Sequence, residues 1–171
     1  VRTMRVLLVR PPSILGAMSR QNLQHPTNIV GLASELNARG HSATVLDLET
    51  APGGMAALEL RLEGARPDVV GVSVVTPHVP GAALLLRRVR DLDAGAFMIA
   101  GGHHATALPA DLLDEIPELD AVCVGEGDRT LVELCDGLDS GRSLTDVAGL
   151  QLRAGGFTGH RDPVEDLDDL A

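Results

Sequence analysis

The chain has 171 residues, 44% of them apolar, which fits one globular domain and excludes a chain that is largely disordered. A net charge of −10 and an aromatic content of 1% argue against nucleic-acid binding, because basic groups bind phosphates and aromatic rings stack on bases. No apolar run reaches membrane length and the first residues do not resemble a signal peptide, so we expect a cytoplasmic domain without a membrane partner. Cys123 and Cys135 lie in apolar patterns, and we expect both to be buried free thiols.

Apolar runs and helical stripes alternate along the chain. Five apolar runs predict strands: residues 5–10, 43–48, 69–75, 96–100 and 121–124. Five sets of apolar residues at spacings of three and four predict the helices that follow them: residues 29–36, 55–65, 82–92, 108–116 and 131–138. Residues 150–153 fit a short edge strand or one arm of a hairpin.

Several element ends carry local signals. The first strand stops at Pro11-Pro12, because proline cannot donate to a sheet ladder. Thr27 or Asn28 can cap the first helix, and Gly40 can close it. Asp47, near the end of the second strand, is either a ribose-binding carboxylate or a solvated turn residue.

The third strand organises the predicted fold. Residues 69–75 contain five valines without alternation of apolar and polar residues, so both faces of this strand should be buried in the middle of a parallel sheet. The strand–helix alternation predicts an α/β, Rossmann-like (flavodoxin-like) doubly wound fold with five parallel strands in the order 2-1-3-4-5. Ligands of such folds bind beyond the carboxyl ends of the strands, where the strand order reverses.

Four loops converge on that edge. Residues 13–28 form a long connection after the first strand, either a functional loop or a disordered insertion. This loop faces residues 73–81, which leave the third strand and are small, polar and rich in proline and glycine. The glycine-rich exits at 101–106 and 125–128 lie on the same edge. A ligand that binds this domain should therefore contact these four loops.

Common catalytic and nucleotide-binding motifs are absent. There is no P-loop, because the chain has no lysine, and no Gly-x-Gly-x-x-Gly follows the first strand. Ser73 and His78 lack a third group for nucleophilic catalysis. His25, His78 and one of the adjacent pair His103 and His104 remain possible metal ligands, since adjacent residues of an extended segment point to opposite sides. What remains is a pocket of glycines and small hydroxyls, suited to close contact with a large flat or branched ligand.

Five segments, in this order and spacing, resemble a known family: Val6 to Pro12, Gly31 to Leu48, Pro67-Asp68-Val69-Val70-Gly71-Val72-Ser73, Ile99-Ala100-Gly101-Gly102-His103-His104-Ala105-Thr106, and Asp120 to Leu131 with its Gly125-Glu126-Gly127. Together they are similar to the cobalamin-binding domain that precedes the core of class B radical S-adenosylmethionine (radical SAM) enzymes. The resemblance covers most of residues 5–153.

The resemblance implies that residues 1–153 form a cobalamin-binding Rossmann-like domain, with the corrin over the carboxyl edge of the sheet and the nucleotide tail beside the third strand. Ser73 matches the small hydroxyl residue that meets the tail, and Gly101 and Gly102 match the glycines that let it pass. The cofactor-binding residues implied in this way all follow strands: Pro12, Ser13, Ile14, Leu15, Gly16, Ser73, Val75, Thr76, Pro77, His78, Gly101, Gly102, His103, Gly125, Glu126 and Gly127.

Two family motifs are missing. Without Asp-x-His-x-x-Gly, the resemblance implies a base-off cofactor with no histidine ligand from that position. No Asp or Glu has the spacing to orient another imidazole, so no histidine is expected on cobalt. Without Cys-x-x-x-Cys-x-x-Cys, the chain cannot hold a [4Fe–4S] cluster with S-adenosylmethionine, and residues 154–171 resemble an acidic linker toward a missing catalytic domain.

Two functions stay open at this point. The first is a cobalamin-binding module for a radical SAM methyltransferase-type domain, attached in cis or acting in trans, so that the chain alone binds but does not catalyse. The second is a flavodoxin-like module that binds another nucleotide or a protein partner. For the first function, we expect Gly102→Leu to abolish cobalamin retention while leaving thermal stability nearly unchanged, because its side chain would occupy ligand space.

Overall fold

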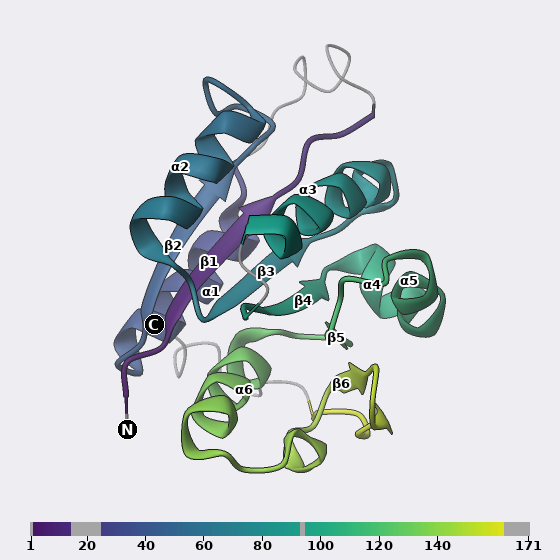
Figure 1. The fold of residues 1–171 in the computed structure, drawn as a ribbon. Helices are drawn as coiled ribbons and strands as arrows, with labels where there is room; N and C mark the ends of the chain where they lie inside the picture. The colour runs from purple at the N-terminus through teal and green to yellow at the C-terminus, as the bar shows by residue number, and fades with distance from the viewer. Residues whose placement is uncertain (1, 15–24, 93–94, 163–171) are drawn as a thin grey trace.

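The computed structural model describes residues 2–14, 25–92 and 95–162, which form one seven-stranded sheet with helices on both faces (Figure 1). The strands are β1 (Arg5–Arg10), β2 (Ser42–Asp47), β3 (Val69–Ser73), β4 (Phe97–Gly101), β5 (Ala121–Cys123), β6 (Leu150–Leu152) and β7 (Gly156–Phe157). The helices are α1 (Thr27–Ala38), α2 (Met55–Ala65), α3 (Val79–Leu92), α4 (His103–Ala107), α5 (Pro109–Glu115) and α6 (Asp128–Ser140), with short 3₁₀ turns at Thr76–His78 and Leu144–Asp146.

The five predicted strands are parallel and occur in the predicted order, β2-β1-β3-β4-β5. The sheet is larger than predicted, because β6 pairs antiparallel with β5 and β7 pairs antiparallel with β6. The expected hairpin arm at 150–153 is confirmed as β6. This hairpin covers the backbone edge of β5, which would otherwise present unpaired hydrogen-bonding groups.

The central position of β3 is confirmed, and both of its faces are buried. Val70 and Val72 pack in the cluster that α2, α3 and α5 cover, whereas Val69 packs in the cluster beneath α1 and α6. Successive strand residues point to opposite faces, so a strand without alternation fills two cores. Cys123 and Cys135 belong to the second cluster and are free, as expected.

Three local expectations are corrected. Residues 103–107 form the short helix α4 instead of a loop, and α3 begins at Val79, next to the 3₁₀ turn, instead of at residue 82. No side chain caps α1; its first turn follows Pro26, and Asn28 makes a different contact that is described below. Gly40 does close the helix, with a positive φ of 93° that a glycine adopts without strain.

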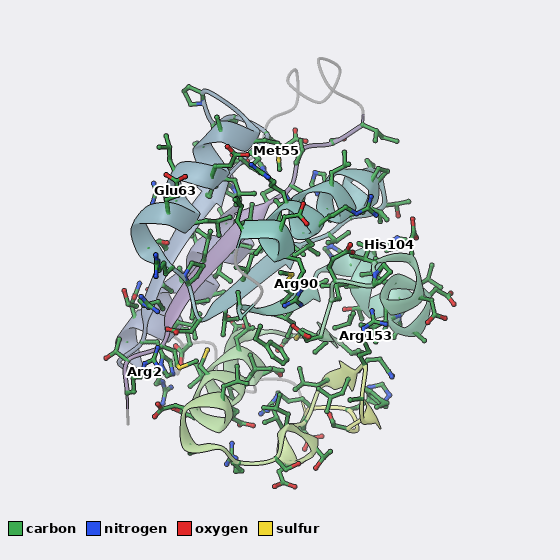
Figure 2. All side chains as sticks on the ribbon, viewed as in Figure 1. Arg2, Met55, Glu63, Arg90, His104 and Arg153 are labelled. Carbon is green, nitrogen blue, oxygen red and sulfur yellow. The ribbon has the colours of Figure 1, made fainter. Side chains whose placement is uncertain are left out.

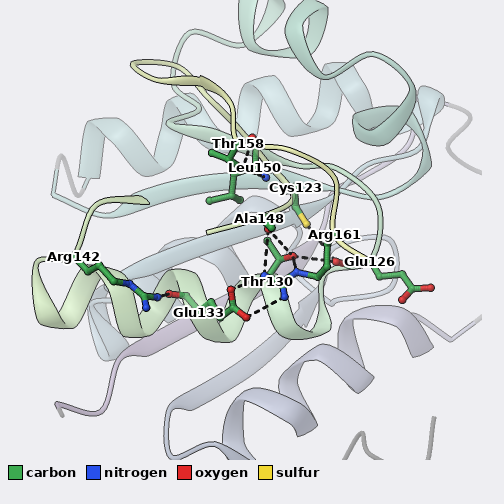
Figure 3. Close-up of polar contacts among 9 residues, drawn as sticks. All are labelled: Cys123, Glu126, Thr130, Glu133, Arg142, Ala148, Leu150, Thr158 and Arg161. Carbon is green, nitrogen blue, oxygen red and sulfur yellow. Dashed lines mark hydrogen bonds and ion pairs between the residues drawn. The ribbon is translucent and has the colours of Figure 1, made fainter. Parts of the chain in front are cut away.

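The folded unit extends past residue 153, because side chains of the C-terminal segment bind the rest of the fold. The Arg153 guanidinium donates to the carbonyls of Leu113, Ile116 and Leu119 at 2.6–2.9 Å, at the end of α5 (Figure 2). Further along, Arg161 forms an ion pair with Glu133 of α6 (Figure 3). Residues 154–161 are thus attached to the domain that the sequence analysis ended at 153.

No helix among the described residues combines the length and hydrophobicity that crossing a membrane requires.

Candidate functional site

A cavity of about 610 Å³, which we call the outer cavity, opens at the carboxyl edge of the sheet. It lies between the start of α1, the β4–α4 junction and the β5–α6 junction, and is lined by Thr27, Asn28, Gly31, Leu32, Gly102, His103, Thr106, Ala107, Gly125, Gly127 and Asp128. Three of the four predicted loops therefore meet around it, at the place where the strand order predicts a ligand.

A second space, the inner slot, continues toward the sheet beneath α1. Its volume is about 60 Å³, and it is lined by Leu8, Asn28, Ile29, Leu32, Gly71, Val72, Ser73, Ile99, Ala100, Gly101, Gly102, Cys123 and Leu131. Asn28, Leu32 and Gly102 line both spaces, so the slot opens into the outer cavity at these residues. The two spaces together form a path from solvent to the faces of β3 and β4.

Ser73 lines the inner slot. It is the last residue of β3, opposite Gly101 in the register with β4. Its hydroxyl accepts a hydrogen bond of 2.7 Å from the side-chain amide of Asn28, which reaches across from the first turn of α1. From the sequence, Asn28 was expected only as a cap of the first helix. Its spacing of four from Leu32 places both residues on one helix face, a signal that could have added them to the candidate site.

Gly101 and Gly102 differ in what their missing side chains would meet. A Cβ on Gly101 would lie 3.7 Å from the Cβ of Cys123, an ordinary contact. A Cβ on Gly102 would lie 2.8 Å from the carbonyl oxygen of Val74, and the residue has a φ of 102°. Gly102 is therefore needed for the fold itself, because neither the space nor the backbone conformation accepts a side chain. The expectation that Gly102→Leu leaves stability unchanged is corrected accordingly.

The exit of β5 forms an acidic corner of the outer cavity. Gly125 has a φ of 86°, and its backbone N–H donates to the Thr106 hydroxyl at 3.0 Å. Burial raises the pKa of the Asp128 carboxyl; its own backbone N–H opposes the rise, and the charges of Glu126 and Glu35 add to it. Glu126 itself is exposed at the rim. An anionic group entering this corner would meet negative charge.

His78 faces into the protein rather than into the outer cavity. Its side chain is 13% exposed, and its Nε2 lies 3.6 Å from a carboxylate oxygen of Glu49, which also accepts the backbone N–H of Ser13. Burial lowers the pKa of His78, and the Glu49 charge partly opposes that effect. No local sequence pattern indicated this contact, because it joins residues far apart in the chain, and at 3.6 Å it is longer than a hydrogen bond.

The other histidines have different settings. His103 lines the outer cavity, whereas His104 is hydrogen-bonded through Nδ1 to the Thr76 hydroxyl at 3.1 Å (Figure 2). Both lie on helix α4, so the extended geometry assumed for them does not apply. His25 is exposed before α1. Within residues 2–14, 25–92 and 95–162, no group of three or more histidine, cysteine or acidic side chains could hold a metal ion.

The loop after β1 and the turn after β3 form the other side of the edge. The backbone N–H of Ile14 donates to the carbonyl of Pro77 at 3.1 Å. Gly81 permits this approach, because a Cβ there would lie 2.1 Å from the carbonyl oxygen of Pro12. Ile14 is 67% exposed and Val75 38% exposed, so this side presents apolar surface to solvent. The expected contact residues Leu15 and Gly16 lie outside the described residues.

A comparable cavity, about 590 Å³, lies at the opposite, amino edge of the sheet. It is lined by Arg5, Leu62, Glu63, Arg66, Pro67, Asp68, Leu92 and Gly95. Asp68 forms ion pairs there with Arg5 at 3.1 Å and with Arg2. Figure 2 labels Arg2, near the N-terminus. None of the predicted ligand-contact residues lies in this cavity.

Comparison with known proteins identifies the family. A family profile described as "B12 binding domain" matches residues 15–135, more than half of the chain. The chain is 27% identical over 175 residues to the uncharacterized methyltransferase PH0819 of Pyrococcus horikoshii, an alignment that covers 99% of this chain and 38% of that protein. It is 28% identical over 173 residues to the anaerobic magnesium-protoporphyrin IX monomethyl ester cyclase of Rubrivivax gelatinosus, an alignment that covers 96% of this chain and 31% of that protein.

The chain thus spans about a third of the length of these relatives. Among solved structures, the cobalamin-dependent S-adenosylmethionine radical enzyme OxsB with aqua-cobalamin bound has the same fold. The TM-score is 0.77 at 18% identity, over 99% of this chain and 24% of that one. The fold, the position of the cavities and the profile agree with the resemblance found in the sequence, and the chain belongs to the B12 binding domain family.

Proposed function

We propose that this domain binds cobalamin, with the corrin over the carboxyl edge of the sheet and the nucleotide tail reaching through the outer cavity into the inner slot. The observation that carries the proposal is that these two spaces adjoin at Asn28, Leu32 and Gly102, where the strand order reverses. OxsB, which shares the fold, is described with aqua-cobalamin bound.

The residues at the edge fit such a cofactor. Exposed apolar side chains at Ile14 and Val75 can cover part of a corrin face, which would remove them from water. Gly101 leaves room beside the slot because its absent side chain meets nothing closer than 3.7 Å. The Ser73 hydroxyl can donate to a ring nitrogen of the tail base. When bound, cobalamin supplies a cobalt centre that can accept and pass on a methyl group.

We further propose that the cofactor is bound base-off and that no histidine of this chain ligates cobalt. A tail in the inner slot cannot also place its base on cobalt. The His78 imidazole lies beside Glu49, and the His104 imidazole is hydrogen-bonded to the Thr76 hydroxyl, so each ring already has a neighbour within this chain. Electron paramagnetic resonance of bound cob(II)alamin tests this. We expect no superhyperfine splitting from an axial nitrogen. Splitting that is present in the wild type and disappears in His78→Ala or His103→Ala would refute the proposal that no histidine ligates cobalt.

We propose that a reaction served by this domain depends on a further, catalytic domain. One relative is described as a methyltransferase and another as a cyclase, and both are far longer than this chain. We propose that the domain serves a radical SAM catalytic domain, in cis or in trans, that holds the [4Fe–4S] cluster, S-adenosylmethionine and the substrate. Residues 154–171 would lead toward that domain, starting from the point where Arg161 is held by Glu133 (Figure 3).

Cofactor retention tests the proposal. The protein is mixed with hydroxocobalamin, desalted and examined by absorbance; a parallel sample receives flavin mononucleotide. We expect close to one equivalent of retained corrinoid and no retained flavin. Retained flavin without corrinoid would favour the flavodoxin-like alternative, and retention of neither would leave only a role in binding a protein partner.

A further inference from the structure

We infer that the Asn28–Ser73 hydrogen bond is a latch across the inner slot, and that the slot behind it selects corrinoids whose lower base is apolar and benzimidazole-like over those with a purine base. This inference rests on the proposed function, and it names the class of ligand that the slot accepts.

The latch is defined by its position. Asn28 and Ser73 belong to different layers, since Asn28 is in the first turn of α1 and Ser73 ends β3. Their 2.7 Å hydrogen bond crosses the junction where the inner slot opens into the outer cavity. A ring that passes from one space to the other has to separate these two side chains.

The size of the slot shows that the latched form is closed to a ring. The slot measures about 60 Å³, whereas a cavity that binds benzene in a protein core is roughly 150 Å³. Leu32 lines both spaces, so its side chain also borders the junction. Entry of an aromatic base therefore requires α1 to move away from the sheet, which breaks the Asn28–Ser73 bond.

The chemistry of the walls sets the selectivity. Beyond Ser73, the slot is bounded by aliphatic side chains, among them Leu8, Ile29 and Leu131. The Cys123 thiol is protonated at neutral pH, because burial raises its pKa to about 11, and it is directed to the carbonyl of Glu126 at 3.9 Å. The neighbouring strands use their backbone groups in the sheet ladder.

The slot can thus satisfy one or two polar atoms of a base, through Ser73 and Asn28. A benzimidazole with its glycosidic bond made has one remaining ring nitrogen, which Ser73 can serve. Adenine carries an exocyclic amine and further ring nitrogens, and each one buried without a partner weakens binding. Discrimination by unpaired polar groups in an apolar site is typically about tenfold to a hundredfold.

Equilibrium dialysis and stopped-flow absorbance with three corrinoids test the inference: cobalamin, its adenine-based analogue, and cobinamide, which lacks the nucleotide tail. We expect the dissociation constant of the adenine form to exceed that of cobalamin by about tenfold or more. Asn28→Ala should speed cobalamin association several-fold and leave cobinamide association unchanged. Asn28→Leu, whose side chain is of similar size but cannot form a hydrogen bond with Ser73, should behave like Asn28→Ala. Val30→Ala, an exposed change on the same helix, should match the wild type.

The possible failures separate the two proposals. Equal affinities for cobalamin and its adenine analogue would overturn the selectivity. Cobalamin association that is unchanged or slower in both Asn28 variants would overturn the latch. In either case the proposal that the domain binds cobalamin would stand. If neither cobalamin nor cobinamide binds, both this inference and the proposed function are overturned.

Discussion

The two edges of the sheet carry cavities of nearly equal volume, about 610 Å³ at the carboxyl edge and 590 Å³ at the amino edge, yet they differ in construction. At the amino edge, Asp68 is held by Arg2 and Arg5, so the charges there are used to join β1 to β3. At the carboxyl edge, glycines line the outer cavity, and the hydrogen-bonded side chains of Asn28 and Ser73 line the inner slot. Volume alone therefore does not distinguish a ligand site from a space between ion-paired strand ends.

The largest effect should come from the carboxyl edge, where two adjacent glycines have separate roles. Gly102→Leu should destabilise the fold by about 3 kcal/mol, because its side chain would meet the Val74 backbone and its φ is positive. Gly101→Ala should change stability by less than about 1 kcal/mol and weaken cobalamin retention. Chemical denaturation and desalting of both variants check this pair. A stable Gly102→Leu protein would show that the backbone at this junction can shift.

A smaller effect is expected at the amino edge. Burial would raise the pKa of Asp68, but hydrogen bonds and charges from Arg5 and Arg2 outweigh it and hold the pKa below 3.8. Asp68→Asn should therefore cost about 1–2 kcal/mol at pH 7, after allowance for the exposure of both arginines, and leave cobalamin retention unchanged.

The pH dependence of Asp68→Asn follows from the sign of that shift. A carboxyl with a lowered folded pKa stabilises the fold above pH 3.8 and loses this contribution as the pH falls through the folded value. The gap in unfolding free energy between wild type and variant should therefore close in acid. Glu63→Gln, an exposed change in the same cavity, is the control and should stay within about 0.5 kcal/mol. Weaker cobalamin retention in Asp68→Asn would contradict the assignment of function to the other edge.

The smallest effect concerns the acidic corner of the outer cavity. The folded pKa of Asp128 is raised, so wild-type stability should fall as the pH rises from 3.8 through that value. Asp128→Asn does not lose stability in this way, so its unfolding free energy at pH 7 should exceed that of the wild type by a few tenths of a kcal/mol. Asp146→Asn, which does not line the cavity, is the control. It should also bind cobalamin a few-fold more tightly, because the phosphodiester of the tail is anionic. Weaker binding would mean that the carboxylate contacts the cofactor.

Local patterns predicted the elements that bury most apolar surface. The valines of β3 indicated a strand with two buried faces, and the strand–helix alternation gave the order of the parallel strands. Helix α4 was missed because five residues without an apolar stripe carry no periodic signal. Strand β7, only two residues long, depends on pairing with β6 rather than on its own sequence.

In the candidate site, too, the contacts between residues far apart in the chain could not be predicted from local patterns. The strand exits at Ser73 and Gly101 were expected at one edge because the carboxyl ends of parallel strands meet there, and the family resemblance suggested a role for these two residues. The Asn28 contact was missed, because a polar residue in a first helical turn has the same local sequence signal whether it caps the helix or reaches another element. The contact between Glu49 and His78 likewise depends on how the loop after β2 meets the turn after β3.

The measurement that tests the account most directly is amide NMR of the protein titrated with cob(II)alamin, whose unpaired electron broadens nearby signals. We expect broadening at the exits of β3, β4 and β5, at residues 73–76, 78, 101–104 and 125–127, and unaffected signals from Arg66 and Asp68 of the amino edge. Broadening centred on Arg66 and Asp68, or no selective broadening with one equivalent of cofactor, would contradict the assignment of the cobalamin site to the carboxyl edge.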